Sequence, residues 1–343
     1  MSKIPYQLYY SKVRDPFFNL ALENHLLLQM QGSPRVLLMW CNDPCVVLGR
    51  FQNPWIECNL SKMSRDKVVL VRRQSGGGTV YHDNKNVNFS FLADKSEHSK
   101  KWNHKIVTQA LSNLGVKAFS TDRGDIRLKE ELERKISGSA FKEKKDVAFH
   151  HGTMLVESDL EKLNLYIHSN KEGLRTKSIS SIRSTVANIK ESVDSIDPET
   201  FIDQLGKCFL SEYSGNGQKE VIIDKDCELY NQILSSDYYS KLKQISWILK
   251  ETPKFFVEEV TENFTISLTI KKSFIETIDI QNNDVHPDFL KKIEESLIYE
   301  SILNIGEAFN SLEADYLNVY KDELSLMKSW FNQFFELDAL DLF

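Results

Sequence analysis

Three consecutive glycines at residues 76–78 follow a segment, 67–73, whose β-branched residues predict a strand. That segment ends in Arg72 and Arg73, and a further strand is predicted at 87–92. Glycine adopts positive φ and lets a ligand approach the backbone, and successive N–H groups in such a turn form an anion-binding nest. The local pattern therefore has two interpretations, an anion site served by an arginine fork or a flexible hairpin turn. Neither the P-loop nor the dinucleotide-binding glycine pattern is present.

The composition excludes several classes of protein. The chain has 343 residues, of which 41% are hydrophobic and 27% charged, as in ordinary globular proteins. Its net charge of -6 lacks the basic excess that binding to nucleic acid or an anionic membrane requires, so we expect neither partner. No apolar run approaches the ~18 residues needed to cross a bilayer. Five cysteines without a C-x-x-C pair fit a reducing compartment, and the N-terminus resembles neither a signal nor a good transit peptide.

Helical and extended patterns alternate along most of the chain. Helices are expected at 18–30, 57–66, 102–114 and 198–210, the last capped by Asp197. Further strands are expected at 35–41, 45–51, 116–119, 125–128 and 147–157, with the first two forming a β-hairpin.

The pattern changes near residue 248 and predicts a second domain. Residues 255–280 alternate as two strands, and helices are expected at 288–299 and 324–335. We therefore expect a larger domain at 1–247 and a small α+β domain at 248–343.

A second candidate motif is KISGSA at residues 135–140. Its lysine lies beside small residues, where an ammonium group is able to polarise an acyl carbonyl or bind a phosphate. For such a hexapeptide taken alone, a solvated loop is the more common explanation. His150 and His151 follow in a predicted strand and face opposite ways, which disfavours a shared zinc ion. We expect one of them to be buried and hydrogen-bonded and the other to lie near the site.

Taken together, these motifs resemble the lipoate–protein ligase A family. RRQSGGGTVYHD at 72–83 is similar to the family signature R-R-x-S-G-G-G-x-V-[FY]-H-D, and KISGSA at 135–140 resembles K-[VI]-S-G-x-A. FHHGT at 149–153 and SIRSTVAN at 181–188 match two further family segments. The likeness runs from about residue 35 to residue 190 and extends weakly into the C-terminal domain. The order and spacing of all four motifs agree with the family.

The resemblance implies both a fold and a reaction. The fold is a mixed β-sheet flanked by helices, shared with biotin protein ligases, with a C-terminal accessory domain. The reaction uses ATP and Mg²⁺ to convert lipoate to lipoyl-AMP, which an acceptor lysine then attacks. The implied acceptors are the apo lipoyl domains of 2-oxoacid dehydrogenase complexes and the glycine-cleavage H protein. The transferred group is lipoyl or its octanoyl precursor.

The same resemblance assigns the site residues, with Lys135 as the catalytic residue. The residues expected to bind ATP or the adenylate are Arg73, Gly76, Gly77, Gly78, Thr79, Val80, Tyr81, Asp125 and Lys135. Those expected to bind the lipoyl group are Gly49, Arg50, Ser75, His82, Lys135, Gly138, His151 and Gly152. An apolar slot for the alkyl chain is expected near Trp40 and Leu48. Magnesium is expected to bind through the nucleotide, with Asp125 as the one candidate side chain.

Two departures from the family pattern are present. Lys85 stands where family members usually have glycine, so the loop there is expected to differ. Gly124-Asp125 replaces the bacterial Asn-Asp, and this second departure leaves the acyl donor open. Arg123-Gly124-Asp125 and the segment 49–60 look more like mitochondrial lipoyltransferases, which are thought to take the acyl group from a modified carrier or an activated donor. The resemblance therefore implies a mitochondrial matrix location, or otherwise a cytoplasmic one, and we expect a monomer.

Three alternatives follow from these observations. The first is a transferase that uses lipoylated H protein, lipoyl-AMP or acyl-CoA without activating free lipoate. The second is a biotin protein ligase, whose G-R-G-R-x-G-R loop is absent. The third is a binding module that has lost catalysis, which the joint presence of Lys135 and the triple glycine disfavours.

Overall fold

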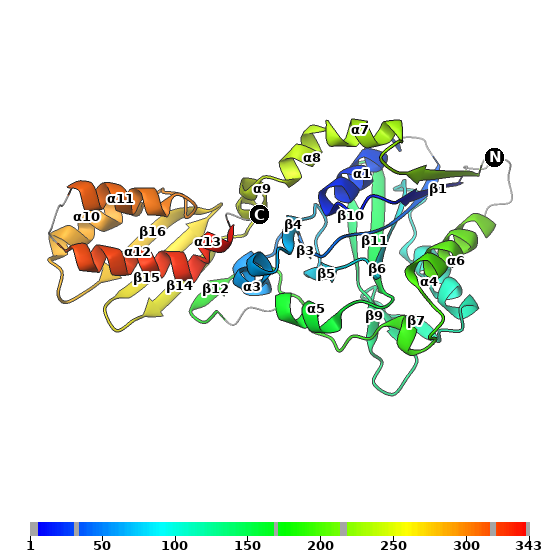
Figure 1. The fold of residues 1–343 in the computed structure, drawn as a ribbon, viewed down its shortest axis with the longest axis horizontal. Helices are drawn as coiled ribbons and strands as arrows, with labels where there is room; N and C mark the ends of the chain where they lie inside the picture. Colours follow the sequence, from blue (N-terminus) through cyan, green and yellow to red (C-terminus); the bar gives the residue numbers. More distant parts are fainter. Residues whose placement is uncertain (1–5, 31–33, 168–170, 213–217, 316–319, 341–343) are drawn as a thin grey trace. The chain divides into compact units, whose positions relative to one another are not determined.

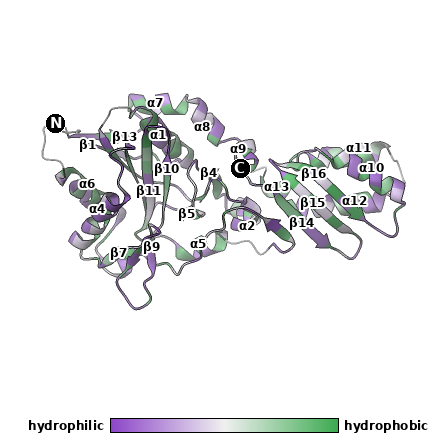
Figure 2. Cartoon of the chain, turned by 180° about the vertical axis from the view of Figure 1, so that it is seen from behind, coloured by the Kyte–Doolittle hydropathy of each residue, from purple (hydrophilic) through white to green (hydrophobic). Residues whose placement is uncertain are grey.

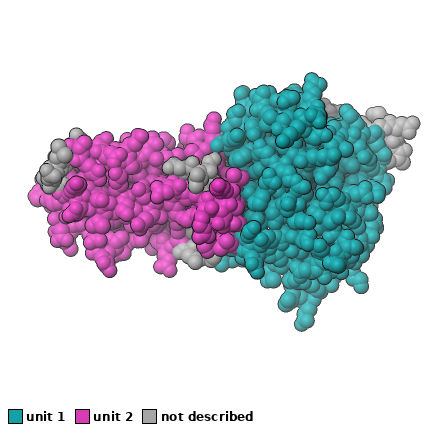
Figure 3. Space-filling model, in the orientation of Figure 1, with its two compact units in different colours: residues 1–49, 71–164, 181–243 teal, residues 50–70, 165–180, 244–343 magenta. Residues whose placement is uncertain are grey.

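A computed structural model of the chain describes residues 6–30, 34–167, 171–212, 218–315 and 320–340. The described residues form two compact units, shown in different colours in Figure 3. Unit 1 contains residues 1–49, 71–164 and 181–243, and unit 2 contains residues 50–70, 165–180 and 244–343. Both units mix helices and strands, which confirms the expected α+β class. No helix among the described residues is long and apolar enough to span a membrane.

A six-stranded mixed sheet forms the centre of unit 1 (Figure 1), with the order β10-β11-β6-β2-β1-β13. The strands are β1 (Tyr6–Ser11), β2 (Arg35–Cys41), β6 (Asn86–Asp94), β10 (Ser139–Glu143), β11 (Val147–Leu155) and β13 (Lys219–Ile223). β1 pairs in parallel with β2 and β13, whereas the other neighbours are antiparallel. β6 and β11 are buried along almost their whole length, and Figure 2 shows hydrophobic residues, in green, among the strands of this sheet. β10, which carries part of the lysine motif, lies at one edge of this sheet.

Helices flank this sheet. They are α1 (Pro16–Leu28), α4 (Lys100–Asn113), α5 (Leu160–Tyr166), α6 (Pro198–Ser211), α7 (Glu228–Leu234) and α8 (Asp237–Leu242), with a 3₁₀ turn at Ile189–Glu191. Asp197 accepts the Thr200 N–H at 2.7 Å, so its predicted role as the cap of α6 is confirmed. Helices α4 and α6 contribute apolar side chains to one buried cluster with the sheet, including Val107, Leu111 and Phe209.

Two small sheets in the structure change the predicted topology. They have the orders β4-β3-β5 and β7-β8-β9. Their strands are β3 (Cys45–Leu48), β4 (Val69–Arg72), β5 (Val80–His82), β7 (Ala118–Ser120), β8 (Ile126–Leu128) and β9 (Lys135–Ser137). The predicted hairpin of 35–41 with 45–51 is wrong, because β2 joins the large sheet while β3 pairs with β4 and β5. Both segments are apolar on both faces, so each finds partners in a different sheet.

Unit 2 is built on a four-stranded antiparallel sheet with the order β12-β14-β15-β16. Its strands are β12 (Leu174–Thr176), β14 (Phe255–Val260), β15 (Thr265–Lys271) and β16 (Phe274–Gln281). Its helices are α2 (Pro54–Glu57), α3 (Leu60–Arg65), α9 (Ile245–Lys250), α10 (Pro287–Leu297), α11 (Ile305–Asp315), α12 (Lys321–Phe335) and α13 (Leu337–Leu340). Two strands were expected at 255–280, but a tight turn at Lys272 and Ser273 divides the second into two. Both turn residues have positive φ, 52° and 73°, without the glycine that would have signalled the turn.

Unit 2 also includes segments from the middle of the chain. Trp55 is fully buried, donates its indole N–H to the Phe335 carbonyl at 2.8 Å and packs on the Phe255 ring. These contacts group residues 50–70 with the C-terminal segment, which begins at Gln244. The compact units thus divide the chain differently from a single boundary at 247/248. The functional division into a catalytic domain and an accessory domain remains a prediction.

Candidate functional site

The side chain of Arg73 holds the glycine turn in shape. Its Nη2 donates to the carbonyls of Gly76 and Gly78, both at 2.7 Å, and its Nη1 donates to the Val47 carbonyl at 3.0 Å. Its Nε donates to Ser75 Oγ at 2.9 Å. Burial lowers the pKa of Arg73 to about 10, so it remains a cation at neutral pH. The guanidinium therefore fixes the turn as well as placing positive charge beneath it.

The glycines differ in how much space surrounds them. Gly77 has a φ of +85°, and a Cβ built there would lie 3.1 Å from Arg73 Nη2 and 3.2 Å from Ala140 Cβ. A Cβ on Gly78 would lie 3.1 Å from Ser181 Oγ, whereas nothing lies within 4 Å of one on Gly76. Gly77 therefore requires glycine both for its backbone conformation and for its close neighbours. This contact with Ala140 brings the glycine turn against the lysine motif.

Lys135 is the first residue of β9 and pairs with Asp125. Its Nζ lies 2.8 Å from Asp125 Oδ1, and Arg127 lies 3.6 Å from the same carboxylate. The Lys135 side chain is 24% exposed, so it remains accessible to a ligand. A Cβ on Gly138 would stand 3.2 Å from Lys135 Nζ, so the small residue in the motif leaves space for the ammonium group. Asp125, predicted near the nucleotide, here orients the lysine.

A buried polar network extends from the glycine turn to α1. Ser75 Oγ lies 2.8 Å from His151 Nε2, and His151 Nδ1 lies 2.9 Å from Glu23 Oε1. Glu23 is fully buried, and its second carboxylate oxygen has no hydrogen-bond partner among the residues that the structure describes. Glu23 was not predicted from the sequence. Arg73, which donates to Ser75, completes a chain of hydrogen bonds from a buried cation to a buried acid.

The two adjacent histidines have different environments, as expected. His150 is fully buried, stacks on the Phe141 ring and lies 3.2 Å from Asn103 Nδ2 through its Nδ1. Burial holds the pKa of His150 well below its usual value, which keeps the ring neutral. His151 faces the other side of β11 and reaches Ser75. The expected buried, hydrogen-bonded histidine is therefore His150, whereas His151, which is also buried, lies beside the glycine turn, and its role at the lipoyl site remains a prediction.

His82, predicted to bind the lipoyl group, is also buried and neutral. Its Nδ1 lies 2.9 Å from Asn42 Nδ2, and burial lowers its pKa to about 3, with smaller contributions from Arg73 and His151. The unfolded chain takes up a proton near pH 6.5, whereas the folded chain resists protonation until about pH 3. The unfolded state therefore binds more protons in that window, and stability falls as the pH is lowered through it.

We expect His82→Gln to weaken the loss of stability between pH 6.5 and pH 4. The wild type should lose about 1 kcal/mol per pH unit through this group within that window. The measurement is the melting temperature against pH, with exposed His286→Gln as the control. An unchanged slope in His82→Gln would contradict the assignment.

Close contacts explain why glycine stands at two further positions that the sequence analysis singled out, Gly152 and Gly124. A Cβ on Gly152 would meet the Phe89 ring at 2.5 Å and the Gly138 carbonyl at 3.1 Å, so this residue supports the packing of the lysine motif. Gly124 has a φ of +91°, and a Cβ there would stand 2.7 Å from Ser139 Oγ. The bacterial asparagine therefore does not fit this position unless Ser139 moves.

The remaining predicted residues occupy several places. The Gly49 carbonyl accepts from Arg72 Nη1 at 3.1 Å, and Thr79 N donates to Ser181 Oγ at 3.0 Å. Val80 and Tyr81 lie on β5. Arg50 belongs to unit 2, where it pairs with Glu251 at 3.1 Å. Trp40 and Leu48, the expected slot, are buried at 2% and 0% exposure.

No group of three His, Cys, Asp or Glu side chains able to hold a metal occurs within the described ranges. Asp125, the candidate magnesium ligand, is already engaged by Lys135 and Arg127. The side chains therefore do not fit a preformed magnesium site.

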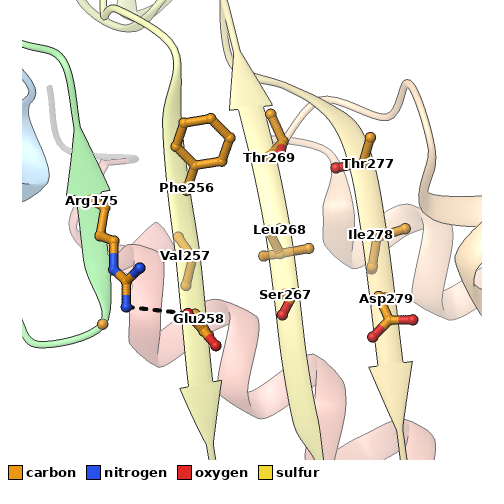
Figure 4. Close-up of a pocket in the computed structure, with 11 residues that line it drawn as sticks. Arg175, Phe256, Val257, Glu258, Ser267, Leu268, Thr269, Thr277, Ile278 and Asp279 are labelled. Atoms are coloured by element: carbon orange, nitrogen blue, oxygen red, sulfur yellow. Dashed lines mark ion pairs between the residues drawn. The ribbon is translucent and has the colours of Figure 1, made fainter.

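Unit 2 has a separate hollow on the open face of its sheet, of about 370 Å³. Figure 4 shows the Arg175–Glu258 ion pair of 3.4 Å beside Phe256, with helices behind the sheet. Its lining, which includes Ser267, Thr269 and Asp279, contains no lysine, histidine or cysteine. The lining also has no run of glycines comparable to residues 76–78, so we place the candidate site in unit 1.

Comparison with known proteins identifies the class of enzyme. Residues 15–210, more than half of the chain, match the family described as the lipoyl protein ligase A/B catalytic domain. The chain therefore belongs to this family. The family relationship supports a ligase or transferase enzyme.

Solved structures support the same fold. The chain resembles LipL1 of P. falciparum, crystallised with lipoate, at 28% identity and a TM-score of 0.62, covering 96% of this chain and 99% of that one. It also resembles a lipoate–protein ligase A bound with ATP, at 23% identity and a TM-score of 0.55, covering 69% of this chain and 96% of that one. A bi-partite lipoate protein ligase of Thermoplasma acidophilum, studied with its E2 lipoyl domain, matches at 22% identity and a TM-score of 0.57. This match covers 69% of this chain and 94% of that one. At these identities the last two support the fold alone.

Proposed function

We propose that the chain is a lipoate–protein ligase that activates lipoate with ATP and transfers the lipoyl group to a lysine of an acceptor protein. The main support for this proposal is that the glycine turn at residues 76–78 lies next to the lysine motif at residues 135–140. The glycine turn packs against Ala140, in the same motif as Lys135, although the motifs are about 60 residues apart in sequence. A backbone turn suited to anions thus adjoins an accessible ammonium group.

The first step joins two anions. A carboxylate oxygen of lipoate attacks the α-phosphorus of ATP, the bond to the β-phosphate oxygen breaks, and pyrophosphate leaves. The Lys135 ammonium and the Arg73 guanidinium lower the repulsion between carboxylate and phosphate. Mg²⁺, bound through the phosphates rather than by a preformed set of side chains, would supply further charge neutralisation.

The second step forms the amide. The neutral amine of the acceptor lysine attacks the acyl carbon, the bond to the AMP oxygen breaks, and AMP leaves while the amine loses a proton. Lys135 is placed to stabilise the negative charge that develops on the carbonyl oxygen. The same lysine therefore serves both steps, first against the carboxylate and then against the oxyanion.

A transferase that starts from an already activated or carrier-bound acyl group is the second candidate. Gly124 favours it, because the bacterial asparagine on the nucleotide side is missing and the space beside Ser139 does not accommodate it. Such an enzyme would need the second step alone and would still require Lys135.

One assay separates the two candidates. Apo lipoyl domain is incubated with the enzyme and, in parallel, with lipoate plus ATP, lipoyl-AMP, lipoyl-CoA or lipoylated H protein, and modification is read by mass spectrometry. Modification with lipoate plus ATP supports the ligase. Modification with the other donors alone supports the transferase, and modification with none of them contradicts both.

The acceptors and the location are further parts of the proposal. The resemblance to lipoate ligases, one of which was studied with an E2 lipoyl domain, supports lipoyl domains as acceptors, with H protein as a second acceptor. We further propose a mitochondrial matrix location, on the sequence likeness around Gly49 and Gly124 to mitochondrial lipoyltransferases.

A further inference from the structure

We propose that the acceptor protein docks against Ile182, on the segment 181–187, which we call the strap. This inference rests on the function proposed above, because it states where the enzyme holds the protein that supplies the lysine. Ile182 belongs to none of the residues assigned to the nucleotide or the lipoyl group.

The strap connects the two motifs of the candidate site. At its start, Ser181 Oγ accepts the Thr79 N–H at 3.0 Å. Near its end, Lys135 N donates to the Thr185 carbonyl at 2.9 Å, and Ala187 N donates to the Lys135 carbonyl at 3.0 Å. The strap is therefore fixed at both ends, to the glycine turn and to the lysine.

Between these anchors, Ile182 is exposed to solvent. Ile182 is 68% exposed, although Ala187 at the end of the strap is fully buried. A single exposed isoleucine is ordinary on a protein surface. The proposal rests on its place in the strap, between the contact of Ser181 with the glycine turn and the contacts of Thr185 and Ala187 with Lys135.

The length of a lysine side chain limits where the acceptor surface lies during transfer. Five bonds separate its Cα from Nζ, so it spans about 6 Å when extended. Consecutive Cα atoms are about 3.8 Å apart, so Ile182 lies one such step from Ser181, whose hydroxyl touches the Thr79 amide. An acceptor lysine that reaches an acyl group between the glycine turn and Lys135 therefore brings its own backbone close to the strap.

The partner that fits is a folded domain that presents its lysine beside an apolar side chain. Ile182 would cover that side chain and be removed from water with it, which favours association. A small amine in solution has no such surface and would not use this contact. A change at Ile182 is therefore expected to weaken transfer to a protein acceptor without slowing transfer to a small amine.

The test compares Ile182→Glu with Ile222→Glu in the full-length chain, with lipoyl-AMP as the donor. Ile222 is 54% exposed on β13, the sheet edge opposite β10, so the same substitution is made away from the motifs. The acceptors are an apo lipoyl domain and hydroxylamine, a small nucleophile that needs no docking surface. Because hydroxylamine also attacks lipoyl-AMP in free solution, hydroxamate is counted only in excess of the enzyme-free reaction. Ile182→Leu serves as the conservative variant.

We expect Ile182→Glu to raise the KM for the domain about tenfold or more, as for loss of a central apolar contact. Its rate with hydroxylamine should stay within about twofold of the wild type, since the docking contact plays no part there. Ile222→Glu and Ile182→Leu should leave both reactions unchanged. An unchanged KM in Ile182→Glu, or an equal loss with both acceptors, would overturn the proposal. If the wild type forms hydroxamate but never modifies the domain, the proposed function itself fails, which is a different result.

Discussion

Lys135→Met should abolish transfer from every donor, with a loss of about 100- to 1000-fold in kcat, as for removal of one preorganised oxyanion donor. Lys135 Nζ is 2.8 Å from Asp125 and remains partly exposed, so the ammonium is both oriented and accessible. Methionine keeps the length and the apolar part of the side chain but removes the charge. The measurement is the initial rate of domain modification with lipoate plus ATP and, separately, with lipoyl-AMP. Equal losses in both reactions are expected, because the lysine serves both steps.

Two further variants separate catalysis from folding. Lys135→Arg keeps the pairing with Asp125 but replaces a compact charge by a planar fork, so it should preserve the melting temperature and still lower the rate. Lys129→Met removes an exposed lysine just after β8 and should alter neither quantity. Transfer by Lys135→Met at close to the wild-type rate would exclude the proposed role.

The candidate site could be found from the sequence because each of its motifs is local. A glycine turn, a lysine beside small residues and two histidines on a strand each leave a signature within about ten residues. The class of fold followed from the resemblance and was confirmed. The identity of the residues that would contact ATP and the lipoyl group remains a prediction, since the structure shows how they are arranged without a ligand.

Contacts between distant segments could not be predicted in this way. Glu23 lies 128 residues from His151, and nothing in the apolar helix PFFNLALENHLLL marks it as the acid that faces a site histidine. The parallel pairing of β1 with β13 likewise joins the two ends of unit 1. The grouping of Trp55 with Phe335 depends on side-chain packing in unit 2 rather than on any local pattern.

The structure adds a role for Arg73 to the predicted one. By resemblance it lines the nucleotide, and this stays a prediction; in the structure its guanidinium donates to two carbonyls of the glycine turn and to Ser75. The arginine therefore also shapes the turn on which the ligand is expected to bind. A substitution in the turn should therefore affect ligand binding through Arg73 as well as through the backbone.

Gly77→Val should weaken adenylate binding far more than it lowers thermal stability. Positive φ costs a β-branched residue about 1–2 kcal/mol or more. The new Cβ would also press on Arg73 Nη2 at 3.1 Å and on Ala140 Cβ at 3.2 Å, so the guanidinium and the lysine motif are both displaced. The measurement is the rise in melting temperature caused by a non-hydrolysable lipoyl-AMP analogue, which reports binding to the folded state.

Gly76→Ala is the matched control for this substitution. A Cβ on Gly76 meets nothing within 4 Å, so alanine there should keep the full ligand-induced rise in melting temperature. Both variants remove one glycine from the same turn. A difference between them therefore reports the backbone conformation and close contacts of Gly77 rather than the number of glycines. If Gly77→Val also keeps the full rise, the triple glycine is a hairpin turn only, and other residues hold the phosphate. If both variants lose it, the ligand needs open space over the whole turn, and the close contacts of Gly77 with Arg73 and Ala140 are not the cause.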